Sequence, residues 1–85
     1  MPPSELLVFI RRRPFVPFRI HLTDGTTYEI GHPEMVMPGI ATAIIGVPVN
    51  PAEPVYGRTE TVALRHVVRL VPLQTPVQNG EAAAP

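Results

Sequence analysis

Residues 17–30 read PFRIHLTDGTTYEI, and this stretch decides the fold. Between Phe18 and Leu22 apolar and polar residues alternate, which is the period of a β-strand with one buried face. The pair Asp24-Gly25 follows, and its tolerance of positive φ suits a tight hairpin turn. Alternation then resumes to the end of the stretch. The sequence therefore predicts two antiparallel strands in a register that is fixed locally.

A short helix and further strands are expected around this hairpin. The helix begins at the N-cap candidate Ser4 and runs to about Arg13, because a proline at position 14 biases the residue before it away from helical ψ. Short apolar stretches bounded by glycine and proline predict strands at residues 35–37, 40–47, 60–64 and 68–71, with a tight turn at residues 64–67. The expected core consists of inward-facing strand residues: Phe18, Ile20, Leu22, Tyr28, Ile30, Val62, Leu64, Val68 and Leu70.

Two segments are predicted to lie outside regular structure. Residues 48–58 contain three prolines and should form a loop that is either functional or mobile. Residues 74–85 are small, polar and flanked by proline, with nothing to bury, which predicts a disordered tail. The expected organisation is one domain at residues 1–73 followed by this tail.

The size of the chain favours self-association. It has 85 residues and no cysteine, so a disulfide or a thiolate metal site cannot reinforce a small core. Oligomerisation is the remaining common route to stability. Residues 40–47 form a continuous apolar run, which suits a strand covered on both faces or one that lies in a subunit contact. We therefore expect a homo-oligomer.

Charge and hydropathy narrow the choice of partners and location. Seven positive side chains, all arginine, balance seven acidic ones, and a neutral chain argues against strong non-specific binding of nucleic acid. No basic segment precedes an apolar signal core at the N-terminus, and no apolar run approaches the ~20 residues of a membrane span. The absence of cysteine fits a reducing compartment. The sequence predicts a cytoplasmic protein with no membrane partner.

No residue spacing in the chain is typical of catalysis or of metal binding. The three histidines, His21, His32 and His66, form no His-x-x-x-His or Glu-x-x-His pattern, and thiolates are absent. The only serine, Ser4, lies at the predicted helix N-terminus without a candidate base beside it. The sequence thus predicts a protein that is not an enzyme and has neither a metal site nor a cofactor.

The order of a short helix, five to six short strands and a one-turn break before the last strand is that of a small SH3-like or Sm-like barrel, a mainly β fold. Pro17 to Leu22 with Gly25 match the pattern Pro-x-x-x-x-Leu-x-x-Gly. Residues 64–67, Leu-Arg-His-Val, with Val-Pro at 71–72 look like a closing Tyr-Lys-His-Ala followed by Val-Pro. In these motifs the chain resembles the bacterial Sm-like RNA chaperones of the Hfq family. The resemblance implies a homo-oligomer that binds single-stranded RNA.

By the same resemblance, five residues would contact RNA. Arg65 and His66 would occupy basic positions that line the pore, and Arg11, Arg12 and Arg13 would form a patch on the rim. The residues by themselves also allow a simpler interpretation, in which the three arginines are favourable charges at a helix C-terminus. His66 would then be a turn residue.

A second function stays open beside RNA binding. The family's base-stacking aromatic residue has no counterpart in residues 31–35, and the chain is neutral. A protein-protein interaction or self-assembly module with no role in nucleic-acid binding could instead use exposed strand edges and residues 40–47. The chain also resembles a group of short, uncharacterised bacterial proteins, which implies a shared fold and no particular activity.

Overall fold

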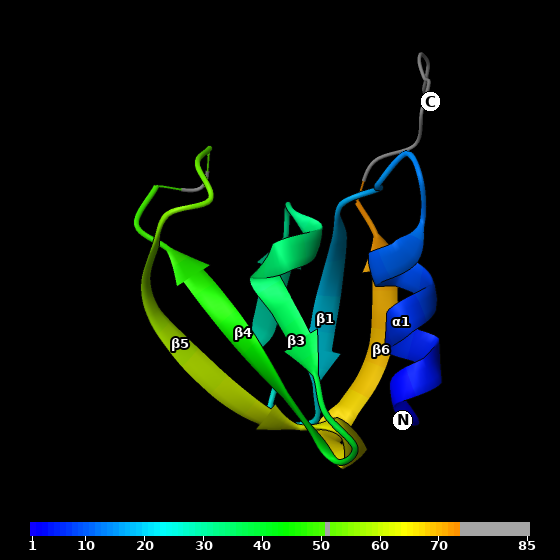
Figure 1. The fold of residues 1–85 in the computed structure, drawn as a ribbon. Helices are drawn as coiled ribbons and strands as arrows, with labels where there is room; N and C mark the ends of the chain where they lie inside the picture. The colour runs from blue at the N-terminus through cyan, green and yellow to red at the C-terminus, as the bar shows by residue number, and fades with distance from the viewer. Residues whose placement is uncertain (51, 74–85) are drawn as a thin grey trace.

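A computed structural model describes residues 1–50 and 52–73 (Figure 1). These residues form a mainly β domain with one short N-terminal helix, which confirms the expected class. The elements in chain order are α1 (Pro3–Arg11), β1 (Phe18–Leu22), β2 (Thr27–Ile30), the 3₁₀ helix η1 (Pro33–Met35), β3 (Val36–Pro38), β4 (Thr42–Pro48), β5 (Tyr56–Ala63), the 3₁₀ helix η2 (Leu64–His66) and β6 (Val67–Pro72). The tail expected at residues 74–85 lies outside the described part of the chain.

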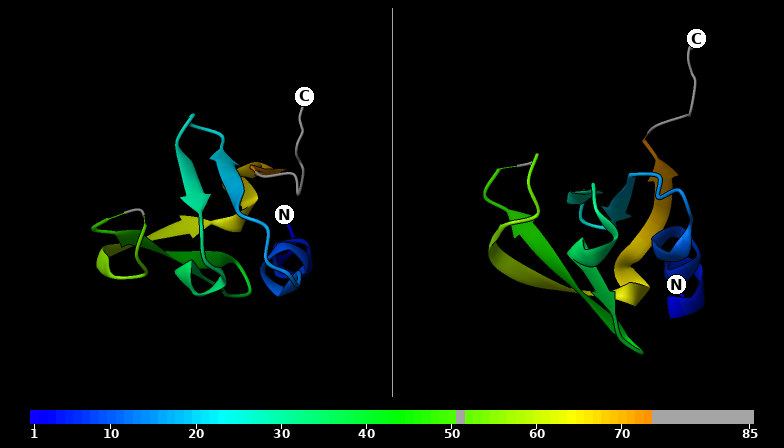
Figure 2. Two further views of the ribbon diagram at one scale, coloured as in Figure 1. Left: turned by 90° about the horizontal axis from the view of Figure 1, so that it is seen from above. Right: turned by 45° about the horizontal axis from the view of Figure 1, so that its top comes forward.

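The six strands form two antiparallel sheets of three strands. One sheet has the order β2-β1-β6 and the other has the order β3-β4-β5, and no strand pairing joins them within the described residues. The sheets meet where η2 leads from β5 into β6, and they diverge toward the opposite end of the molecule (Figures 1 and 2). Each sheet therefore keeps two edge strands.

The hairpin predicted from residues 17–30 is confirmed. Phe18 pairs with Ile30, and three further pairs continue the register toward the turn. Gly25 adopts a φ of 88°, a conformation that costs other residues steric strain. The carboxylate of Asp24 accepts a hydrogen bond from the backbone N–H of Thr26 at 2.9 Å. This local hydrogen bond and the glycine both favour the turn.

The core lies between the two sheets. Of the expected core residues, five are buried, namely Phe18, Ile20, Ile30, Val62 and Leu64. Three more, Leu22, Tyr28 and Leu70, are partly buried and pack against that core. The sequence missed several core residues that other elements contribute, namely Leu6, Met35, Val36, Ala43, Ile45 and Val67.

The prediction for Val68 is wrong, because this side chain is 58% exposed. The pairing of β1 with β6 shifts between His21 and Leu22, so that Leu22 pairs with Val67 while His21 pairs with Arg69. Val68 is the extra residue at this irregularity and has no partner in β1. Such a bulge exchanges the two faces of a strand locally, which explains why Val67 is buried in place of Val68.

The helix starts and ends earlier than expected. Its N-cap is Pro2, with Pro3 in the first turn, so Ser4 lies inside the helix and caps nothing. Proline suits the first helical position because its missing N–H would have no partner there. The helix ends at Arg11, two residues before the expected end. Leu6 is its buried residue, and α1 lies against β3.

The strand at residues 40–47 is covered on one face only within the chain. In β4 the side chains of Ala43 and Ile45 are buried, whereas Ile44 between them is exposed, and Ile40 in the preceding turn is 93% exposed. The alternative of a strand covered on both faces is therefore not seen within the described residues, and a subunit contact stays a prediction.

The loop expected at residues 48–58 is shorter than predicted. Strand β4 extends to Pro48 and β5 begins at Tyr56, so the connection comprises residues 49–55. The ring of Tyr56 lies over Gly46, where a Cβ would be only 2.9 Å from the ring. A glycine in β4 thus gives the aromatic ring the space that lets pairing with β5 continue to this point.

Candidate functional site

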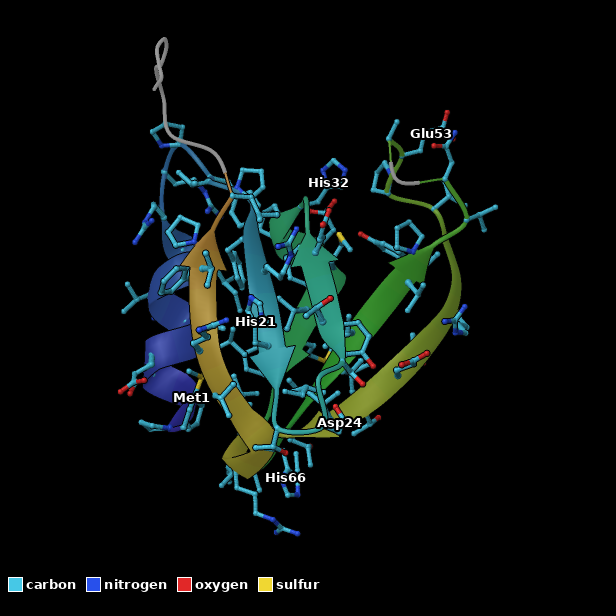
Figure 3. All side chains as sticks on the ribbon, turned by 180° about the vertical axis from the view of Figure 1, so that it is seen from behind. Met1, His21, Asp24, His32, Glu53 and His66 are labelled. Carbon is cyan, nitrogen blue, oxygen red and sulfur yellow. The ribbon has the colours of Figure 1, made fainter. Side chains whose placement is uncertain are left out.

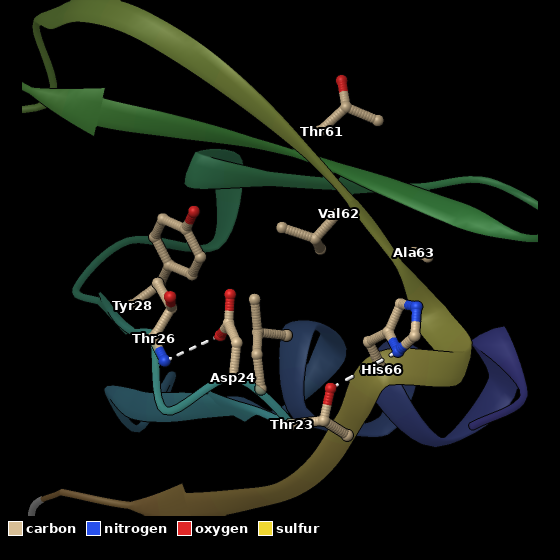
Figure 4. A pocket seen from close by; sticks show the side chains of 9 residues that line it. Thr23, Asp24, Thr26, Tyr28, Thr61, Val62, Ala63 and His66 are labelled. Atoms are coloured by element: carbon tan, nitrogen blue, oxygen red, sulfur yellow. Dashed lines mark hydrogen bonds between the residues drawn. The ribbon is translucent and has the colours of Figure 1, made fainter.

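A polar groove of about 390 Å³ lies between the β1–β2 turn, η2 and β5 (Figure 4). The turn supplies one wall, β5 supplies the other, and His66 of η2 closes one end. Leu22, Thr23, Asp24, Thr26, Tyr28, Thr61, Val62, Ala63 and His66 line it. The turn and η2 are 40 residues or so apart in sequence, so only the folded chain brings these groups together.

Hydrogen bonds hold the turn against η2. The backbone N–H of Thr23 donates to the carbonyl of His66 at 2.9 Å, and the Thr23 hydroxyl lies 3.4 Å from Nδ1 of His66. Hydrogen bonds from the backbone and the side chain of Thr26 lower the pKa of Asp24. The groove therefore contains a carboxylate held by its own turn, next to an imidazole and a hydroxyl.

Tyr28, Glu60 and Arg58 connect the two sheets beside the groove. The Tyr28 hydroxyl donates a hydrogen bond to Oε1 of Glu60, and Nε of Arg58 donates to Oε2 of the same carboxylate at 2.9 Å. The hydrogen bond to Glu60, together with desolvation, raises the pKa of Tyr28 to about 12. The hydrogen bonds from Tyr28 and Arg58 lower the pKa of Glu60. This network fixes the distance between β2 and β5.

Replacing Tyr28 with phenylalanine is expected to lower the free energy of unfolding by about 1 kcal/mol at neutral pH, the usual net value of one hydrogen bond. In the wild type the raised pKa of Tyr28 stabilises the fold fully below pH 10, and this contribution is lost as the pH rises toward about 12. The variant lacks that loss. Denaturant titrations at a series of alkaline pH values measure the free energy of unfolding of both proteins. The values for the wild type and for the variant should approach each other as the pH rises.

Tyr56 also has a raised pKa, caused by desolvation and the charge of Glu34, and it remains in the variant. Some alkaline loss of stability is thus expected in both proteins, and the difference between them reports Tyr28. A constant difference between the curves from pH 7 to about 12 would show that Tyr28 does not donate to Glu60 in solution.

The groove runs along the free edge of β5. Three consecutive residues of this strand, 61–63, line it. Because successive side chains of a strand point to opposite faces, a groove that touches all three lies along an edge of the strand. The other edge of β5 pairs with β4, so the groove exposes the unpaired edge.

The predicted RNA contacts fall at two ends of the domain. His66 lines the groove and Arg65 is exposed beside it. The N-terminal amino group donates to the carbonyl of Leu64 at 3.1 Å, so α1 starts at this end. The nine residues of α1 extend about 13 Å from there, which places the arginines at positions 11–13 near the far end of β6. One chain therefore does not combine the two groups in a single surface.

The arginines at the end of α1 have local partners. Nη1 of Arg13 donates to the carbonyls of Ile10 and Arg12, each at 2.8 Å, and the guanidinium of Arg12 lies 4.9 Å from the centre of the Phe9 ring. The contacts of Arg13 satisfy carbonyls at the helix C-terminus, which agrees with the simpler interpretation of this run.

The groove combines hydrogen-bonding side chains with an apolar floor. Its polar groups are hydroxyls, one carboxylate and one imidazole, and its floor includes the apolar side chains of Leu22 and Val62. In residues 1–50 and 52–73 no group of three potential metal ligands comes together. A strand edge flanked by hydrogen-bonding side chains is the chemistry that binds an extended polypeptide segment. The sequence analysis did not identify Asp24, Tyr28 and Thr61 as groove residues. The sequence marked Asp24 as a turn residue, and no local pattern shows that the turn lies beside β5.

No family model, curated protein or solved structure matches this chain. The resemblance to the Sm-like RNA chaperones thus stays a prediction. In the described part of the chain no helix combines the length and the apolarity needed to cross a membrane.

Proposed function

We propose that the protein is a non-catalytic binding module that assembles with copies of itself through the free edge of β5. The single observation that carries this proposal is the groove along residues 61–63, where one edge of the eight-residue strand β5 has no strand partner within the described residues. Unpaired N–H and C=O groups of an edge strand are a template for an added strand. A partner strand placed there would gain backbone hydrogen bonds and contacts with the turn residues.

Exposed apolar residues on the neighbouring sheet surface support a protein partner. Met37 of β3 pairs with Ile44 of β4, which pairs in turn with Thr61 of β5. Met37 is 66% exposed and Ile44 is also exposed, so an apolar row leads to the free edge. Burial of this row would add hydrophobic stabilisation to strand pairing, at about 25 cal/mol per Å².

The proposal extends to the type of β fold and to the oligomeric state. We propose that the two sheets are halves of a small SH3-like or Sm-like barrel that forms a homo-oligomer. The order of helix, strands and the η2 turn before β6 supports it. In a cytoplasmic homo-oligomer, edges that one chain leaves open would be paired between chains.

Single-stranded RNA binding is the second candidate, and the position of His66 favours it. His66 and the exposed Arg65 lie at one end of the groove, so assembly would repeat this pair once per copy. A ring of such pairs would concentrate positive charge on a neutral protein. The arginines at positions 11–13 would then contact phosphates from a different side of the assembly.

Replacing Thr61 with lysine is expected to weaken self-association at least about tenfold, because a charged side chain on an edge strand opposes strand addition. The matched control is Thr42→Lys. Thr42 is also an exposed threonine, but it lies on β4, a strand that pairs with β3 on one side and with β5 on the other. Sedimentation velocity over a range of concentrations measures both variants. A wild type that is monomeric at high micromolar concentration, or equal effects of the two lysines, would contradict self-assembly through β5.

Native mass spectrometry of protein purified with and without nuclease separates the two candidates. Self-assembly predicts the same oligomer in both samples. The RNA candidate predicts bound nucleic acid that nuclease removes, and weaker binding of uridine-rich RNA after Arg65→Ala in fluorescence anisotropy. An oligomer that binds no RNA at low salt would leave self-assembly as the function.

A further inference from the structure

A cationic row crosses the outer face of the β2-β1-β6 sheet. Ile20 of β1 is buried, so its neighbours Arg19 and His21 point to the opposite face. His21 pairs with Thr27 of β2 on one side and with Arg69 of β6 on the other. Figure 3 shows this side of the molecule, with His21 on β1. Arg19, His21 and Arg69 are thus neighbours, although they come from two strands far apart in sequence.

The charges of this face are not balanced. Nη2 of Arg19 donates to Glu29 at 2.6 Å. Within the described residues Arg69 forms no ion pair. Desolvation, followed by the charges of Arg69 and Arg19, lowers the pKa of His21. With Arg19 paired to Glu29 and Arg69 without an ion pair among the described residues, this face has an excess of positive charge that a bound anion would offset.

The spacing of the three side chains determines which anion fits. Opposite residues in an antiparallel pair have Cβ atoms about 4.5–5.5 Å apart, and diagonal neighbours are about 7–8 Å apart. Arg69 is opposite His21 and diagonal to Arg19, because Arg19 pairs with Val71. The long arginine side chains can therefore reach one point above the imidazole from two sides.

We propose that Arg19, His21 and Arg69 bind the phosphate group of a small phosphate-bearing molecule on the outer face of this sheet. A phosphate monoester carries close to two negative charges and three acceptor oxygens, which match three donors. Arginine binds such oxygens with paired N–H groups. The other residues of this face are Thr27, Glu29 and Val71. None is aromatic, so recognition is restricted to the phosphate group.

Glu29 sets the strength of this site. Its carboxylate contacts one terminal nitrogen of Arg19 and leaves the remaining N–H groups of the guanidinium for a ligand. It also places a negative charge beside the incoming anion. The other acidic group near the row is Glu5 of α1, which lines a second groove together with Arg69. Removing the charge of Glu29 should consequently tighten anion binding.

The test is a titration of the full-length protein with inorganic phosphate, followed by NMR of the His21 ring. Arg69→Ala is expected to weaken binding at least about tenfold, the factor that one charge-assisted hydrogen bond supplies. Glu29→Gln should bind more tightly than the wild type. Arg58→Ala is the matched control, because Arg58 pairs with Glu60 on the other sheet. Uridine 5′-monophosphate as a second probe shows whether a nucleotide binds more tightly than the free anion.

Sulfate is the probe for the contribution of the imidazole, because its charge does not change with pH. Sulfate should bind more tightly at about pH 5.5 than at about pH 7.5, values that bracket the ordinary titration range of histidine. The dependence on pH should disappear in His21→Gln. This distinguishes a ligand contact by His21 from a purely structural role.

The site does not require assembly through β5, so a monomeric protein that binds phosphate would separate the two proposals. An unchanged affinity in Arg69→Ala would overturn the phosphate site, as would the absence of any shift at millimolar phosphate. Acetate binding as tightly as phosphate would also overturn it, because the face would then not distinguish phosphate from a carboxylate such as those of an acidic protein segment.

Discussion

Replacing Phe18 with alanine is expected to remove a large part of the stability of the domain. Phe18 is fully buried at the start of β1, the central strand of its sheet, where it pairs with both Ile30 and Pro72. Its ring lies 5.2 Å from that of Phe9 and 6.1 Å from that of Phe15. Truncating a buried phenylalanine to alanine costs about 3–5 kcal/mol, and the loss of aromatic pairs adds to this.

The expected loss is a large share of the stability of so small a domain. At about 0.05–0.15 kcal/mol per residue, 73 residues have a free energy of unfolding of roughly 4–11 kcal/mol. Thermal unfolding followed by circular dichroism measures the effect. Phe15→Ala is the control, because Phe15 is only partly buried at the edge of the same cluster and should cost less. Equal melting temperatures for Phe18→Ala and the wild type would show that this cluster is not the centre of the core.

Replacing Leu6 with alanine is expected to cost about 2–5 kcal/mol and to release the helix from the sheets. Leu6 is 1% exposed and is the only buried residue of α1. A helix of nine residues is not stable in water by itself, so its structure depends on this packing. Because alanine favours the helix more than leucine does, the loss reports packing and not helix propensity.

Val8→Ala on the same helix is the matched control. Val8 is 60% exposed, and its replacement should change stability by no more than about 0.5 kcal/mol. Urea denaturation gives both free energies, and hydrogen exchange in α1 shows whether the helix opens separately. Similar costs for Leu6→Ala and Val8→Ala would mean that the helix is not docked through Leu6.

By itself, the sequence determined the features that depend on neighbouring residues. The hairpin at residues 17–30 and the presence of a short helix before it follow from alternation, the Asp24-Gly25 pair and the positions of prolines, although the helix bounds differ from those expected. The tight turn expected at residues 64–67 is present as η2. Each of these signals acts over a few residues. The same alternation predicted the buried residues Phe18, Ile20 and Ile30 of the β2-β1-β6 sheet.

Only the tertiary structure decided the register between distant strands, and with it the candidate sites. Thr23 meets His66 across 43 residues and Tyr28 meets Glu60 across 32. Arg69 lies opposite His21 at the last pair before the register shift that exposes Val68. A one-residue shift exchanges the faces of a strand, and nothing in a local sequence pattern specifies it. The groove at β5 and the cationic row therefore depend on packing between segments that no local propensity can align.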